Sequence, residues 1–125
     1  MFDDLLAAAA NMDDAEKEYE RAYKNRSRLY QVRYVTSNDI HKTKKKAKKA
    51  VDKLSKLPHD SKKKRERIET KIVEYKQEIR RLNKKYKKYS KRYQKALSVE
   101  NAQLANYYDC RKKYDRASAC LYAAM

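Results

Sequence analysis

The chain contains no glycine and a single proline, Pro58, in 125 residues. Strands joined by tight turns need residues that reach positive φ, which glycine supplies most easily, so a chain without glycine is a poor candidate for a β-rich fold. Residues of high helix propensity, such as alanine, lysine, glutamate and leucine, are abundant instead. The composition therefore predicts an all-α protein.

Apolar residues recur with a 3.5-residue period on both sides of the proline. With Leu5 as position a of a heptad, the a and d positions continue in one register to Leu57, and a second series runs from Ile68 to Ala124. Two uninterrupted heptad series are typical of two helices that pack as a left-handed coiled coil.

The segment LPHDS at residues 57–61 separates the two series. Proline disfavours helix in the residue before it, and Asp60 or Ser61 can cap the helix that follows. A connection this short makes the helices antiparallel neighbours. We therefore predict one domain over 1–125, a long antiparallel helical hairpin with arms at about 3–57 and 61–124 and a turn at 58–61.

Facing residues are set by the position of the turn. In one register the residue numbers of each facing a and d pair sum to 122, which centres the turn on Ser61. Large seam residues then face small ones, as Tyr107 faces Ala15. A sum of 129 is the alternative. The first register also places Arg26 within reach of Glu100.

One cluster in the first arm, Thr36-Ser37-Asn38-Asp39, prefers caps and turns to helix interiors. The heptad register carries through the cluster, which favours one continuous helix. A break or bend near 36–39 is the alternative, and it leaves the hairpin intact.

The basic residues are concentrated in the middle of the chain. Residues 42–95 contain 24 Lys or Arg and 6 Asp or Glu, a balance of +18, whereas residues 1–41 carry −2 and residues 96–125 carry +1. Like charges this dense destabilise helices, and a bound polyanion would remove that cost. Lys outnumbers Arg, and Asn and Gln are scarce, so we expect contact with phosphates of RNA or DNA, duplex favoured, rather than base readout.

The candidate nucleic-acid-binding residues are cations of the three densest basic runs. They are Lys42, Lys44, Lys45, Lys46, Lys48, Lys49, Lys62, Lys63, Lys64, Arg65, Lys84, Lys85, Lys87, Lys88, Lys91 and Arg92. Tyr86, Tyr89 and Tyr93 are interleaved with the last run at a or d positions, which favours a place in the seam. Stacking on bases, for which the rings must face outward, is the alternative.

Near the termini the apolar surface is wider than one seam. Tyr23 and Tyr30 are at e positions of the first arm, Leu97 and Leu104 are at e positions of the second, and Tyr108 is nearby. Surplus apolar stripes on a helix indicate another contact. We expect self-association of two hairpins into a four-helix bundle, with a heterologous protein partner as the alternative.

No motif for catalysis or for a cofactor is present. The sequence lacks a glycine-rich phosphate loop and a Ser/His/Asp arrangement, and His41 and His59 are far along the hairpin from Cys110 and Cys120, so neither an enzyme nor a metal site is expected. The same reasoning predicts no small-molecule substrate.

No apolar run approaches the roughly 20 residues that span a bilayer, and no basic region precedes LLAAAA as in a signal peptide. We expect a cytoplasmic, nuclear or nucleoid protein, neither secreted nor transmembrane, that has reduced cysteines and does not bind membranes. A short chain rich in Lys and Tyr suits a viral or phage accessory protein acting on a host nucleoprotein. The alternative function is a coiled-coil adaptor or inhibitor whose basic region binds an acidic protein.

Overall fold

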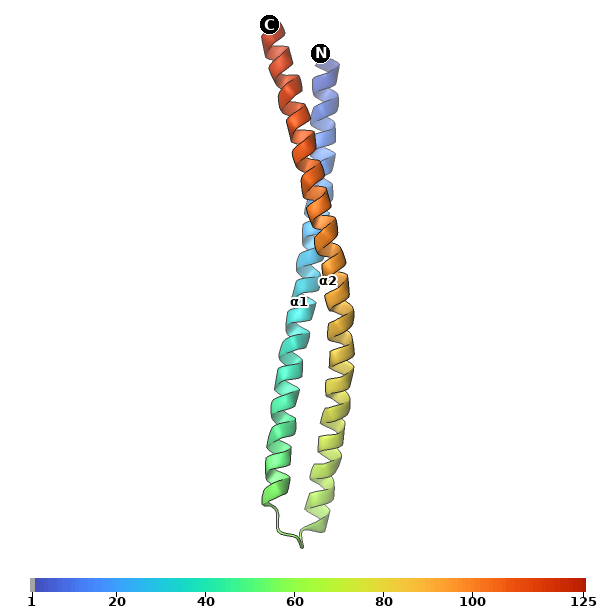
Figure 1. Ribbon diagram of the computed structural model, residues 1–125, viewed down its shortest axis with the longest axis vertical. Helices are drawn as coiled ribbons and strands as arrows, with labels where there is room; N and C mark the ends of the chain where they lie inside the picture. Colours follow the sequence, from blue (N-terminus) through green and yellow to red (C-terminus); the bar gives the residue numbers. More distant parts are fainter. Residues whose placement is uncertain (1) are drawn as a thin grey trace. The chain divides into compact units, whose positions relative to one another are not determined.

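The computed structural model describes residues 2–125, which form two α-helices, α1 (Phe2–Lys56) and α2 (Lys62–Ala124), joined by a short turn (Figure 1). No strand occurs within these residues. The ends of both helices lie within one residue of the predicted arms. The all-α helical hairpin is therefore confirmed.

Backbone hydrogen bonds close the connection between the helices. The N–H of Leu57 donates to the carbonyl of Leu54 (3.3 Å), and the N–H of Ser61 donates to the carbonyl of Pro58 (3.2 Å). The Ser61 carbonyl accepts from the N–H of Arg65 at 3.0 Å, which is the first hydrogen bond of α2. Ser61 is thus the N-cap residue, one of the two residues predicted for that position.

The packing divides the chain into two units, each built from one segment of α1 and one segment of α2. The terminal unit comprises residues 1–30 and 92–125, and the basic unit comprises residues 31–91. Ala15, Ala22 and Leu29 are buried in the terminal unit. The buried residues of the basic unit are Thr36, Ala50, Ile72 and Leu82.

The burial pattern follows the predicted heptads. Every predicted a or d residue from Leu5 to Leu57 and from Ile68 to Leu121 is buried or half-buried, and Ala124 alone among the predicted seam residues is exposed. The core is therefore a narrow seam, and most of both helices faces solvent. Neither helix has a stretch within residues 2–125 that is long and apolar enough to cross a bilayer.

An ion pair crosses the seam of the terminal unit. Arg26 Nε lies 2.5 Å from Glu100 Oε2 and its Nη2 lies 3.3 Å from Oε1, so the predicted contact is confirmed. The guanidinium also lies over the Tyr23 ring, 5.0 Å from the centroid. The hydrogen bond to the Glu100 carboxylate raises the pKa of Arg26. The ring centroids of Tyr30 and Tyr93 lie 5.9 Å apart in the same unit.

Thr36 is the most buried side chain, with 1% of its surface exposed. Its hydroxyl donates to the carbonyl of Val32 at 2.7 Å, so the polar group is satisfied within its own helix. α1 is one helix through 36–39. A bend at this cluster stays a prediction.

Candidate nucleic-acid interface

Charge separates with the two structural units. The basic unit carries 23 Lys or Arg and 7 Asp or Glu, a balance of +16, whereas the terminal unit carries 11 and 10, a balance of +1. The division between the units follows from backbone packing and not from charge. Nearly the whole net charge therefore belongs to one packed pair of helix segments.

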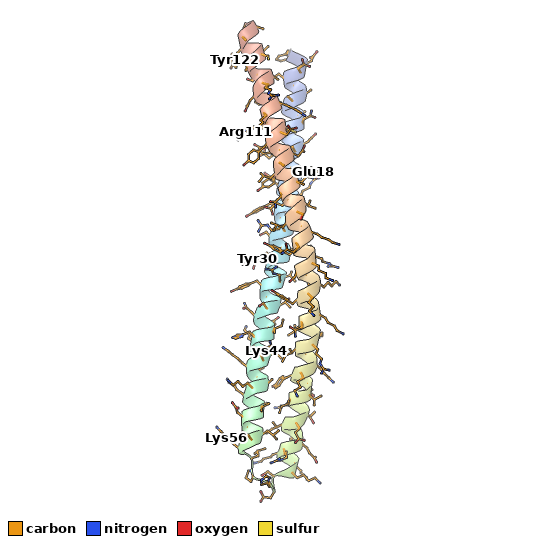
Figure 2. The ribbon with its side chains drawn as sticks, viewed as in Figure 1. Glu18, Tyr30, Lys44, Lys56, Arg111 and Tyr122 are labelled. Carbon is orange, nitrogen blue, oxygen red and sulfur yellow. The ribbon has the colours of Figure 1, made fainter. Side chains whose placement is uncertain are left out.

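Fifteen of the sixteen candidate binding residues are exposed on the surface. Among the exposed lysines, Lys44 extends away from α1, as does Lys56 in the last turn of that helix (Figure 2). The exception is Arg65, which is half-buried, with its Nε shielded from solvent and without a hydrogen-bond partner. Arg65 continues the seam series one step toward the turn from Ile68, and this position explains its burial. Arg92 belongs to the terminal unit, next to its boundary.

The tyrosines of the last basic run lie in the seam. Tyr86, Tyr89 and Tyr93 are all half-buried, and the Arg33 guanidinium lies over the Tyr86 ring at 5.9 Å. Base stacking needs rings that present a face to solvent. The geometry therefore supports a packing role for these tyrosines.

A groove of about 210 Å³ lies between the helices of the basic unit, and we call it the basic groove. Its lining residues are Lys46, Lys49, Ala50 and Lys53 of α1 and Ile68, Lys71 and Tyr75 of α2. Four of the seven are lysines, and none is a carboxylate. The other three are seam residues that form an apolar floor beneath the ammonium groups.

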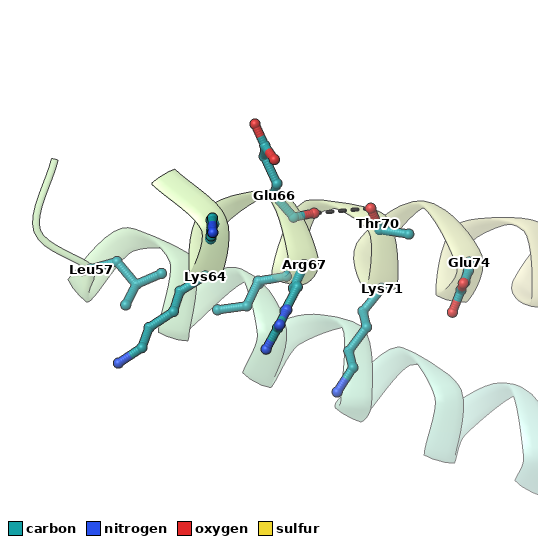
Figure 3. A pocket seen from close by; sticks show the side chains of 9 residues that line it. Leu57, Lys64, Glu66, Arg67, Thr70, Lys71 and Glu74 are labelled. Atoms are coloured by element: carbon teal, nitrogen blue, oxygen red, sulfur yellow. Dashed lines mark hydrogen bonds between the residues drawn. The ribbon is translucent and has the colours of Figure 1, made fainter. Parts of the chain in front are cut away.

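A second groove, the turn groove, has a volume of about 690 Å³ and shares Ile68 and Lys71 with the basic groove. Lys64, Arg67 and Lys71 extend from α2 to the same side, whereas Glu66 extends to the other side (Figure 3). The remaining lining residues are Leu57, Lys63, Thr70 and Glu74. The Thr70 hydroxyl donates to the Glu66 carbonyl at 2.9 Å. The two grooves form one continuous cationic surface.

One ion pair within α2 neutralises part of the nearby charge. Arg81 Nε donates to Glu78 Oε2 at 2.9 Å. This hydrogen bond lowers the pKa of Glu78 and raises the pKa of Arg81, and the charge of Asp39 also favours the protonated guanidinium. Arg81 thus neutralises the Glu78 carboxylate.

Three groove residues were not among the candidates identified from the sequence. Lys53 and Lys71 fall outside the three densest basic runs, and Arg67, the last residue of the run at 62–67, was not selected from it. Lys53 and Lys71 occupy g positions and Arg67 occupies a c position of the heptads. Extending the heptad letters from the seam to its flanks would have found all three.

Comparison with models of known protein families, with curated proteins and with solved structures finds no match. Within residues 2–125, no group of three or more His, Cys, Asp and Glu side chains is placed to hold a metal ion. The functional argument therefore depends on the charge, exposure and grooves of the basic unit.

Proposed function

We propose that this protein is a non-enzymatic nucleic-acid-binding protein whose basic unit contacts the phosphates of RNA or DNA with little sequence preference. The observation that carries the proposal is the division of charge, +16 in the basic unit and +1 in the terminal unit. Every lysine of the basic unit is exposed. Phosphate contacts by such lysines release condensed counterions, which drives association.

The residue types support backbone contact over base reading. The basic groove is lined by lysines and contains no Arg, Asn or Gln. These three residue types form the bidentate hydrogen bonds that read the edges of guanine and adenine. Lysine ammonium groups act as point charges that suit phosphate oxygens. Long, regular helices hold these charges in a row, so a duplex with regularly spaced phosphates is the favoured ligand.

Gel-shift titrations with duplex RNA, duplex DNA and single strands of equal length, at several salt concentrations, test the proposal. We expect binding to all of them, tightest to duplexes, with log K falling linearly with log salt by about 0.7–0.9 per phosphate contacted. Scrambling the duplex sequence should leave the affinity unchanged. Absence of binding at about 0.05 M salt, where phosphate contacts are strongest, would contradict the proposal and favour an acidic protein partner.

We also propose that the protein forms a homodimer through the terminal unit. Tyr23, Tyr30 and Tyr108 are exposed by 47%, 41% and 51%, while Leu97 and Leu104 are half-buried. In the terminal unit the g residues Asn25, Arg92 and Val99 line one groove, so the four e-position residues flank the other side of the seam. Two basic units of charge +16 repel each other strongly, whereas two terminal units of charge +1 repel only weakly.

Sedimentation equilibrium at micromolar concentration should show a dimer. Replacing Tyr23 and Leu104 with glutamine is expected to raise the dimer dissociation constant by at least about tenfold, since each change removes apolar area from the contact. Val99→Gln is the matched control, because Val99 is 52% exposed and occupies a g position, on the other side of the seam from the e residues. A parent protein that remains monomeric at about 100 µM, well above the Kd of a stable dimer, contradicts self-association.

A further inference from the structure

The basic unit has two unlike sides. Heptad positions c and g of both helices flank the seam on the groove side, as shown by Lys46 and Lys71, which are g residues of α1 and α2 and line one groove. Positions b and e flank the seam on the opposite side, where Lys44 and Lys76 lie. The groove side carries 11 basic and 3 acidic residues, a balance of +8, against 6 and 2, a balance of +4, on the opposite side.

The acidic residues of the groove side do not reach the basic groove. Glu78 is paired with Arg81, and neither Glu78 nor Asp39 lines the basic groove. Glu74 lines the turn groove, but it is absent from the lining of the basic groove. The four lysines of the basic groove therefore act together on an incoming anion.

The spacing of these lysines fits an extended anion better than a compact one. Lys46, Lys49 and Lys53 recur once per turn of α1, with rises of about 4.5 and 6 Å along the axis. Lys71 faces them from α2, across a floor that includes Ala50, which is only 9% exposed. Successive phosphates of a strand lying along the groove can contact the three lysines of α1 on one side and Lys71 of α2 on the other.

We propose that the basic groove holds one sugar-phosphate strand, so that nucleic acid contacts the basic unit from the groove side and not from the opposite side. This inference rests on the proposed nucleic-acid-binding function and assigns its binding face. The exposed lysines of the opposite side contribute to the long-range field, but they do not contact phosphates. A lysine can therefore lie in a dense basic run of the sequence and still not contact the nucleic acid.

Two triple variants with the same net charge test the face. The groove variant changes Lys46, Lys49 and Lys71 to glutamine, and the opposite-side variant changes Lys44, Lys48 and Lys76 to glutamine. All six lysines are exposed, and each variant alters two residues of α1 and one of α2. Fluorescence anisotropy with a labelled duplex reports the affinity, and circular dichroism confirms that helicity is kept.

The groove variant is expected to bind about 10²-fold more weakly than the parent at about 0.1 M salt and to lose about 2 to 3 from the salt slope, because three lysines that bind phosphates are replaced. The opposite-side variant should weaken binding by about threefold or less, through the screened field alone. Arginine at the three groove positions should retain binding, which separates charge from any change in folding.

Equal weakening by the two triple variants would overturn the assigned face while leaving nucleic-acid binding in place. A larger effect of the opposite-side variant would also overturn it. A parent that binds no duplex at about 0.05 M salt would overturn both the face and the proposed function, because phosphate contacts are strongest at low salt.

Discussion

Replacement of six lysines in α1 with glutamine is expected to weaken duplex binding by about 10³-fold at about 0.1 M salt. The six residues are Lys44, Lys45, Lys46, Lys48, Lys49 and Lys53. Three of them line the basic groove. Because a phosphate contact strengthens binding by close to a factor of ten between 1 M and about 0.1 M salt, the loss of each contact weakens binding by about that factor. Replacing the other three lysines lowers the attractive potential of the basic unit. Anisotropy titrations against the parent measure the change.

A charge-matched variant of the terminal unit provides the control. It replaces six exposed cations with glutamine, namely Lys17, Lys24, Arg111, Lys112, Lys113 and Arg116. The net charge falls by the same six units, so the two variants have the same net charge. We expect the affinity to fall by about threefold, because every lysine that binds phosphate is kept. Equal weakening in the two variants would show that binding follows net charge and not the basic unit.

The second large effect concerns stability. Arg26→Ala is expected to lower the free energy of unfolding by about 2–4 kcal/mol, since it leaves the Glu100 carboxylate unpaired in the seam. The side chains of Arg26 and Glu100 are 23% and 11% exposed, so water compensates only part of the loss. Urea denaturation followed by circular dichroism, at one fixed protein concentration, measures the difference.

Arg21→Ala is the matched control for this experiment. Arg21 pairs with Glu18 one turn away on α1, with side chains 74% and 53% exposed, and such surface pairs contribute about 0.5 kcal/mol or less. The double change Arg26→Met with Glu100→Leu should restore the stability, because an apolar pair in a seam avoids the desolvation of two charges. Similar destabilisation by Arg26→Ala and Arg21→Ala would show that the buried ion pair does not stabilise the hairpin.

Most of the fold follows from the sequence because a coiled coil repeats one simple rule. The heptad letters identified which residues are withdrawn from solvent, including the polar members Arg26, Thr36 and Glu100. The lone proline located the turn, since proline restricts the residue before it. The division into two packed units was not predicted, because apolar periodicity continues through both of them.

The candidate site was predicted less completely. Charge density identified the basic unit, but it gave Lys44 and Lys46 the same weight although they flank opposite sides of the seam. Lys53 and Lys71 come together from segments 18 residues apart in sequence, and only the packing of the helices places them in one groove. Arg65 was included for its charge, and its half-buried position follows from the seam, which extends further toward the turn than the apolar series indicates.

Lysine footprinting tests the central claim most directly. The full chain is acetylated briefly with and without a saturating duplex, and modification of each lysine is read by mass spectrometry. We predict strong protection in the basic unit, greatest at Lys46, Lys49, Lys53 and Lys71. Lys17, Lys24, Lys112 and Lys113 of the terminal unit, all exposed, should keep their reactivity as internal controls. Protection spread evenly over both units, or confined to the terminal unit, would contradict the account.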